Sequence, residues 1–155
     1  MNQPPVASAG ADRAVRAGSL VTLDGTGSVD PDGGPAPLTF AWTQTAGPAV
    51  SLAGATTASP TFTPGAAGVL TFGLVVDDGL AASAPDSVSI TVPVRGDVDL
   101  DGDVDLDDVN LIAGARGTPA GGPNDVRDLN GDGRIDALDA RIAVTLCTRP
   151  RCATQ

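Results

Sequence analysis

Apolar and polar residues alternate along several short runs in the first part of the chain. Four runs are clear, and each places apolar side chains at every second position: Val21 and Leu23; Leu38, Phe40 and Trp42; Leu70, Phe72, Leu74 and Val76; and Val88, Ile90 and Val92. Such alternation is typical of strands with one buried face. Weaker runs lie at residues 6–9, 50–52 and 61–63, with turn-forming clusters between the runs. About seven short strands without helical periodicity predict an antiparallel β-sandwich over residues 1–94.

A different pattern follows, because twelve of the nineteen Asp residues lie between Asp97 and Asp139. Two twelve-residue segments align with each other: DVDLDGDVDLDD at Asp97–Asp108 and DLNGDGRIDALD at Asp128–Asp139. Each has an oxygen-bearing side chain at positions 1, 3, 5, 9 and 12, Gly at position 6 and a β-branched apolar residue at position 8. Each leads into apolar residues at helical spacing, so we predict two loop–helix repeats in a second, all-α domain at residues 95–155.

These positions carry the ligands that an EF-hand-type calcium loop requires. In such a loop the side chains at 1, 3 and 5 bind the ion, position 7 offers its carbonyl, position 9 holds a water and a carboxylate at 12 binds with both oxygens. The expected ligands are Asp97, Asp99, Asp101, Asp103, Asp105 and Asp108 in the first loop, and Asp128, Asn130, Asp132, Arg134 (through its carbonyl), Asp136 and Asp139 in the second. Gly102 fixes the register of the first loop, because only a start at Asp97 places it at position 6.

Exposed turns rich in Asp and Gly are the alternative for either loop taken alone. Two loops in matching register favour a metal, and so does the repulsion among carboxylates that lack a cation between them. Calcium suits a flexible, all-oxygen site better than magnesium, which demands a tight octahedron. Two bound ions would change the formal charge from -10 to about -6.

The composition excludes several classes of function. The chain has nineteen acidic residues, all Asp, nine basic residues, all Arg, and no His or Tyr. Without His or Lys it cannot form a Ser-His-Asp triad, a Cys-His pair, a Schiff base or a His-ligated zinc site. A net charge of -10 argues against a nucleic-acid partner, and no apolar run reaches the roughly 18 residues of a membrane span. We therefore expect a protein that is not an enzyme.

Residues 3–94 resemble a PKD-type immunoglobulin-like domain. The resemblance rests on the SxDPDG turn at Ser28–Gly33, the strand with Trp42, and the late strand that ends at Val76–Gly79. It implies an Ig-like sandwich of extracellular, multi-modular proteins that serves as a spacer or in cell adhesion. Some calcium-binding PKD-like domains use positions that match Asn2, Asp30, Asp32 and Asp77, which makes these four a candidate third metal site. A tight turn explains Asp30 and Asp32 without a cation and is the favoured interpretation.

Residues 95–147 resemble a type I dockerin domain, through the duplicated loops that are each followed, but not preceded, by a helix. The resemblance implies a small domain that folds on binding two calcium ions and docks onto a cohesin-like domain of another secreted or cell-surface protein, as in a cellulosome-like assembly. The implied partner-binding residues are Leu106, Asp107, Ala113, Gly114, Ala137, Leu138, Arg141, Val144 and Thr145. Asp at position 12, where a full EF-hand usually has Glu, is part of this resemblance. One feature departs from the family: the hydroxyl pair often seen at positions 10 and 11 is absent from both repeats.

Cys147 and Cys152 form a C-x4-C tail after the second predicted helix. An oxidising compartment favours a disulfide between them, and two free thiols are the alternative. Two thiols without a His make a zinc site improbable.

The leading hypothesis is thus a non-catalytic, extracellular assembly protein that binds calcium and then a cohesin-like partner, with the sandwich as spacer. One alternative is self-assembly of copies of the chain into a stalk or fibre through sandwich–dockerin contacts. Another is that the chain is the C-terminal targeting end of a larger secreted hydrolase.

Overall fold

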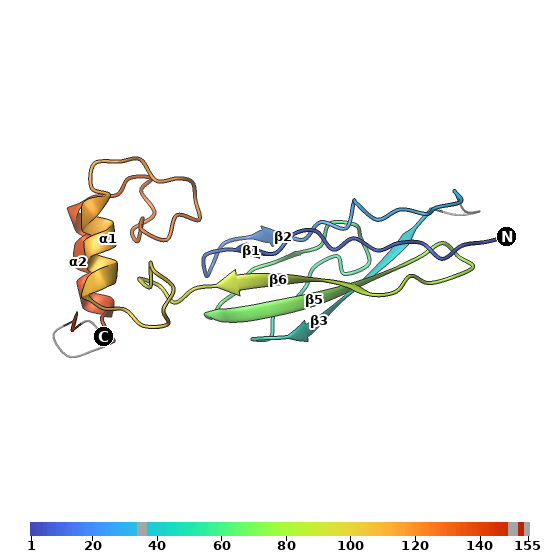
Figure 1. Cartoon of the computed structure of the whole chain (residues 1–155), viewed down its shortest axis with the longest axis horizontal. Coiled ribbons are helices and arrows are strands. Elements are labelled where there is room, and N and C mark those ends of the chain that lie inside the picture. Colours follow the sequence, from blue (N-terminus) through green and yellow to red (C-terminus); the bar gives the residue numbers. More distant parts are fainter. Residues whose placement is uncertain (34–36, 149–151, 154–155) are drawn as a thin grey trace. The chain divides into compact units, whose positions relative to one another are not determined.

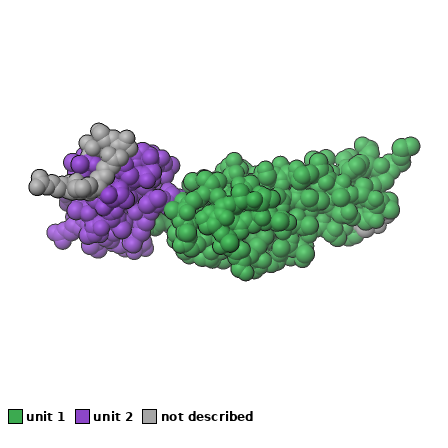
Figure 2. Space-filling view, turned by 90° about the horizontal axis from the view of Figure 1, so that it is seen from below, with its two compact units in different colours: residues 1–92 green, residues 93–155 purple. Residues whose placement is uncertain are grey.

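The protein is described by a computed structural model that covers residues 1–33, 37–148 and 152–153. It forms two compact units, Met1–Val92 and Pro93–Gln155, shown in different colours in Figure 2. The division falls two residues before the boundary predicted from the sequence. Part of the predicted C-x4-C tail, residues 149–151 and 154–155, lies outside the described residues.

Unit 1 is a β-sandwich, as the alternation predicts. Its strands in the described residues are β1 (Arg13–Ala14), β2 (Val21–Thr22), β3 (Thr39–Ala46), β4 (Thr61–Phe62), β5 (Gly68–Asp77) and β6 (Asp86–Val92). One sheet has the order β1-β6-β5-β3, and Figure 1 labels these four strands. The other sheet pairs β2 with β4. The β3·β5, β5·β6 and β2·β4 pairs are antiparallel.

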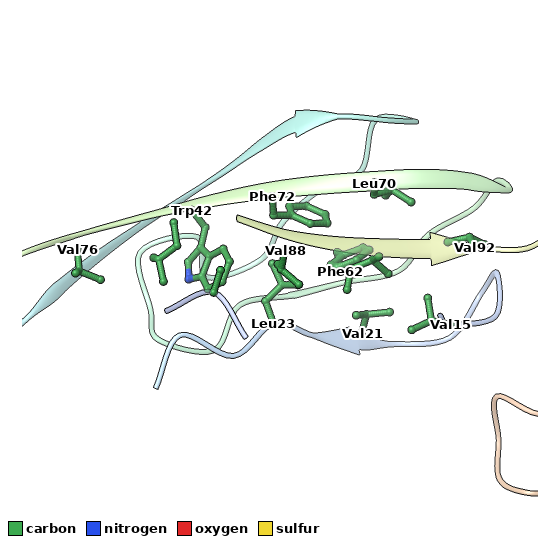
Figure 3. Packing of buried hydrophobic residues seen from close by; sticks show 13 residues of the cluster. Val15, Val21, Leu23, Trp42, Phe62, Leu70, Phe72, Val76, Val88 and Val92 are labelled. Carbon is green, nitrogen blue, oxygen red and sulfur yellow. The ribbon is translucent and has the colours of Figure 1, made fainter. Parts of the chain in front are cut away.

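The core of unit 1 lies between the two sheets (Figure 3). Residues Leu70, Phe72, Leu74 and Val76 of β5 are each 0% exposed, and Phe72 lies opposite Val88 of β6. The Phe72 ring also packs against Phe62 of the other sheet, with ring centroids 4.7 Å apart. Each such side chain stabilises the fold by roughly 1.5–3 kcal/mol through burial, which fixes the strand register because a slip of one residue would expose the whole set.

Three details of unit 1 differ from the prediction. β1 was not foreseen, because both of its residues are exposed, and it pairs parallel to β6 in a sandwich predicted to be antiparallel. Residues 50–52 are not a strand, although the adjoining Ala53 bridges Thr61. In the run at residues 6–9, only Val6 pairs, through an isolated bridge to Val29.

Unit 2 contains two helices in its described residues, α1 (Leu106–Gly114) and α2 (Ala137–Leu146). Each begins after an Asp N-cap, Asp105 or Asp136, whose side chain accepts a backbone N–H of the first turn. The small core between them consists of Ile112, Leu129, Ile135 and Ala143, with partly buried residues around it. No helix precedes either loop within residues 93–96 or 120–127. In the part of the chain that the structure describes, no helix combines the length and apolar character needed to cross a membrane.

Candidate metal centre

The first loop runs from Asp97 to the start of α1 and buries three of its carboxylates. Asp97, Asp105 and Asp108 are only 4%, 3% and 1% exposed. Asp108 holds the loop closed, since its Oδ1 accepts the N–H groups of Val98 (2.6 Å) and Asp99 (3.3 Å) and its Oδ2 accepts that of Asp105 (2.8 Å). The position-12 carboxylate therefore bonds to both ends of the loop.

Carboxylate oxygens of three residues of this loop converge. One oxygen each of Asp97, Asp99 and Asp108 lies within 4.8 Å of the others. Asp97 Oδ2 accepts the N–H of Gly102 at 3.2 Å, whereas Asp97 Oδ1 is buried and has no hydrogen-bond partner among the described residues. Loss of hydration on burial raises the pKa of Asp97 more than the N–H groups of Leu100 and Gly102 lower it, and the charges of Asp108 and Asp101 raise it further. The same two causes, loss of hydration and neighbouring carboxylates, raise the pKa of Asp99. The first loop thus holds negative charge that its own residues do not compensate.

The second loop repeats these hydrogen bonds. Asp139, 0% exposed, accepts the N–H groups of Leu129 (2.8 Å) and Asn130 (3.1 Å) on Oδ1 and that of Asp136 (2.9 Å) on Oδ2. At position 1, Asp128 Oδ2 accepts the N–H of Gly133 at 2.9 Å. These match, position for position, the bonds that Asp108 and Asp97 make in the first loop.

The remaining predicted ligands also have matching partners in the two loops. The N–H of position 5 donates to the side chain of position 3, at 3.2 Å from Asp101 to Asp99 and 3.0 Å from Asp132 to Asn130. The N–H of position 7 donates to the side chain of position 5, at 3.1 Å from Asp103 and 2.9 Å from Arg134. The register assigned from the sequence therefore describes two loops of the same geometry.

Position 1 is where the loops differ. Asp128 Oδ1 accepts the N–H of Gly131 at 2.8 Å, so both of its oxygens are hydrogen-bonded, in contrast to Asp97. The side-chain amide of Asn130 also donates to Asp132 at 2.8 Å, which ties two predicted ligands to each other. Among the described residues, the three-carboxylate group forms in the first loop alone.

Positions 9 and 12 have a structural role as well. In each repeat they form a capping box, in which the N-cap side chain accepts an N–H of the helix and the position-12 side chain accepts the N–H of the N-cap residue. A capping box stabilises a helix without any metal. The side chains at positions 1, 3 and 5 have no such role in a helix.

The predicted third site in unit 1 is not assembled as expected. Asn2 donates its side-chain amide to Asp78 (3.0 Å) and not to Asp77, whose Oδ1 instead accepts the N–H of Gly79 in the following turn. Asp32 accepts the backbone N–H of Gln3 (2.7 Å), and Asp30 Oδ1 accepts the N–H of Asp32 (3.2 Å). Described carboxylates do not form a group of three here.

Asp78 is a buried residue that was not among the predicted site residues. It is 0% exposed, and its pKa is lowered by the N–H groups of Ala81 and Leu80 and by the amide of Asn2. The signal was present, because position 78 continues the inward-facing series 70, 72, 74 and 76. A second missed residue is Arg95, whose guanidinium donates to the carbonyl of Leu129 at 2.7 Å and so links the first loop's entrance to the second loop.

Further predictions concern the tail and the partner surface. Cys147 and Cys152 form a disulfide, with their Cα atoms 5.3 Å apart. All nine implied partner-binding residues, Leu106, Asp107, Ala113, Gly114, Ala137, Leu138, Arg141, Val144 and Thr145, are exposed. Leu111, which the helical pattern did not distinguish from the buried Ile112, is exposed as well, at 47%.

Comparison with solved structures gives matches that cover little more than half of the chain. A nucleoside hydrolase-related hypothetical protein from Saccharophagus degradans, associated with carbohydrate metabolism, is 26% identical with a TM-score of 0.49, over 59% of this chain and 26% of that one. The PKD domain of the KIAA 1837 protein is 30% identical with a TM-score of 0.48, over 56% of this chain and 83% of that one. The chain thus spans about a quarter of the length of the first of these proteins. No curated protein matches it.

Unit 1 matches a known protein family. Residues 9–92, which carry all six strands and the sandwich core, match the family described as K319L-like, PKD domain. This confirms the PKD-type resemblance of residues 3–94, and the chain belongs to the K319L-like PKD domain family.

Proposed function

We propose that unit 2 is a calcium-dependent docking module that binds two calcium ions, and that the PKD domain is a non-catalytic spacer outside the cell. One observation carries the proposal: the position-12 carboxylates of the two loops make the same hydrogen bonds, and a buried carboxylate oxygen of Asp97 has no hydrogen-bond partner among the described residues. A buried charge without a partner is costly, and a cation at this position would compensate it.

The donor set fits calcium. The side-chain atoms at positions 1, 3, 5 and 12 are carboxylate oxygens, apart from the amide of Asn130, and hard oxygen donors of this kind suit calcium. The first ion would be held by Asp97, Asp99, Asp101 and Asp108, with the carbonyl of Asp103 and, through a water, Asp105. The second would be held by Asp128, Asn130, Asp132 and Asp139, with the carbonyl of Arg134 and, through a water, Asp136. A bound calcium ion supplies positive charge that offsets the repulsion among these carboxylates.

The two helices offer a surface for a partner. Leu106 of α1 and Leu138 and Val144 of α2 are 45%, 49% and 54% exposed, and exposed apolar side chains on these two helices are candidates for contact with a partner. Calcium would order the loops from which both helices begin and so fix the spacing of these side chains. We therefore propose a protein partner, a cohesin-like domain of a secreted or cell-surface protein.

The sandwich supports this role. PKD domains often take part in protein–protein interaction or adhesion, and the core of unit 1 is built from its own apolar side chains. A rigid module next to a docking module serves to set the distance between two attached partners. No chemistry of its own is needed for that function.

Isothermal titration tests the first step. Calcium should bind with a stoichiometry of two per chain, and circular dichroism should show loss of helix when a chelator removes it. Magnesium at the same concentration is the control, since it should bind more weakly. No heat of binding at micromolar to millimolar calcium would refute the proposal.

A second candidate function is self-assembly, favoured by the same exposed side chains on α1 and α2. Sedimentation velocity at several protein concentrations, with calcium and with chelator, distinguishes the two functions. Calcium-dependent polymers of the pure chain would support self-assembly. A monomer that binds an immobilised cohesin-like domain only in calcium would support docking.

A further inference from the structure

Position 8 of each loop is bonded to the segment that follows the helix of the other repeat. Ile135 of the second loop donates its N–H to the carbonyl of Thr118 (3.0 Å) and accepts the N–H of Gly117 (2.9 Å), after α1. Val104 of the first loop accepts the N–H of Thr148 (2.9 Å), after α2, and donates its own N–H to the Thr148 hydroxyl (3.1 Å). Both apolar side chains are 0% exposed. Each loop is therefore anchored at its centre by the opposite repeat.

The two anchors differ in chemistry. The N–H of Ile135 bonds to a backbone carbonyl, whereas that of Val104 bonds to a side-chain hydroxyl. Thr148 is exposed, and it directly follows Cys147, which the disulfide joins to Cys152. Because α2 ends at Leu146, Thr148 lies outside the helix, and the cross-link nearest to it is the disulfide of the neighbouring Cys147.

The anchor also lies against the entrance of the first loop. Gly96, the residue before Asp97, has a φ of +99°, and a Cβ there would lie 3.2 Å from both Val104 Cγ1 and Leu146 Cδ1. The backbone that leads to Asp97 thus packs on Val104 and on the last residue of α2. A shift of Val104 would move the backbone on both sides of it, toward Asp97 and toward Asp105.

We propose that Thr148 is a positioning residue for the first loop and that the Cys147–Cys152 disulfide holds it there. Reduction of this disulfide should then weaken calcium binding at the first loop and not at the second. The inference rests on the proposed function, that both loops bind calcium. A dithiol reductant such as dithiothreitol transfers two electrons to the disulfide, giving two cysteine thiols and its own cyclic disulfide. The hydroxyl anchor then becomes free to leave Val104, whereas the backbone anchor at Ile135 is unaffected.

The test is a calcium titration of the full chain followed by NMR, with the amides of Gly102 and Gly133 as separate reporters of the two loops. Thr148→Val should weaken binding at Gly102 by about three- to tenfold, which corresponds to one net hydrogen bond, and leave Gly133 unchanged. Thr148→Ser keeps the hydroxyl and should restore the affinity. Thr118→Val is the matched control: it removes the hydroxyl that donates to the carbonyl of Ala115 (2.7 Å) but keeps the carbonyl that anchors Ile135, so it should change calcium binding at neither loop.

Reduction of the wild-type chain should reproduce the effect of Thr148→Val. Equal weakening of both loops, or no change at Gly102 in the variant and the reduced protein, would overturn the proposal and leave the calcium function standing. No calcium response at either glycine in the oxidised wild type would overturn both. Hydrogen exchange in chelator gives a readout without calcium: the Val104 amide should exchange faster in Thr148→Val, and unchanged exchange would show that the hydroxyl is not its anchor.

Discussion

The same substitution at position 1 of the two loops should change stability in opposite directions when calcium is absent. Asp97 and Asp128 are equivalent in the repeat, but one has an unpartnered oxygen and the other has both oxygens hydrogen-bonded. We therefore expect Asp97→Asn to stabilise calcium-free unit 2 and Asp128→Asn to destabilise it.

The magnitude for Asp97 follows from its neighbours. Two carboxylates 4.8 Å apart, the limit within which Asp97, Asp99 and Asp108 lie, repel by about 1 kcal/mol in water and by about 3.5 kcal/mol at an effective dielectric constant of 20. The asparagine keeps an oxygen for the N–H of Gly102 but buries an amide, which costs about 1 kcal/mol or more if unsatisfied. The net expectation is a gain of about 1 kcal/mol.

Asp128 has the opposite balance. Its oxygens accept the N–H groups of Gly131 and Gly133, and an asparagine can accept only one of them well. The other backbone N–H then faces the side-chain NH2 of the asparagine, which is also a donor, at a cost of about 1–3 kcal/mol. For a unit of this size, each kcal/mol changes the melting temperature by roughly 4–8 °C.

The assay is thermal unfolding of the full chain followed by the helical circular dichroism signal, which reports unit 2 because the strands are in unit 1. In chelator, Asp97→Asn should melt above the wild type and Asp128→Asn below it. In calcium, both should melt below the wild type, because each has lost a ligand. A melting temperature of Asp97→Asn below that of the wild type in chelator would refute the charge argument. The same order of melting temperatures in calcium as in chelator would refute the metal site.

Three further predictions concern the rest of the chain. Gly47→Ala should destabilise unit 1 more than Gly18→Ala when their urea unfolding is compared. Both glycines have positive φ, which costs roughly 1–2 kcal/mol with a side chain, but only at Gly47 would a Cβ collide with backbone, at the carbonyl oxygen of Val69. The N–H groups of the following turn lower the pKa of Asp78, so its contribution to the stability of unit 1 is fully present above about pH 4 and is lost as the pH falls through the lowered value. In urea titrations over a pH series, the free energy of unfolding of Asp78→Asn should therefore decrease less in acid than that of the wild type. Arg127→Lys should lower the free energy of unfolding of unit 2 by roughly 0.5–1 kcal/mol, because lysine cannot reproduce the two parallel hydrogen bonds of 2.9 and 2.7 Å that the guanidinium donates to Asp125. If the geometry of these bonds and not the charge is the cause, the difference between variant and wild type should persist in 1 M salt.

The local pattern of apolar and polar residues was sufficient to predict the strands and loops whose side chains are deeply buried. The period-two runs predicted β2, β3, β5 and β6 because their side chains fill one core, and the register of the first loop followed from Gly102 at position 6. β1 could not be predicted in this way, because its two exposed residues carry no alternation and their pairing with β6 is set by the fold.

The site details that escaped the sequence depend on contacts between distant residues. Asn2 selects Asp78, 76 residues away, over the adjacent Asp77, and a pattern of acids in a turn cannot distinguish the two. Thr148 reaches Val104 across 44 residues. The unequal bonding of Asp97 and Asp128 is likewise invisible in two segments that align position for position.

The double role of the loop carboxylates decides which variants can test calcium binding. Positions 9 and 12 cap the helices with or without an ion, so replacing Asp105, Asp108, Asp136 or Asp139 would unfold the helix start and lower calcium binding indirectly. Positions 1, 3 and 5 have no part in the capping boxes, and loss of hydration together with neighbouring carboxylates raises the pKa of Asp97 and of Asp99 in the first loop. A residue that destabilises the free protein and is nevertheless needed in calcium cannot be explained by helix capping. Substitutions of Asp97 and Asp99 therefore separate a metal site from an acidic turn.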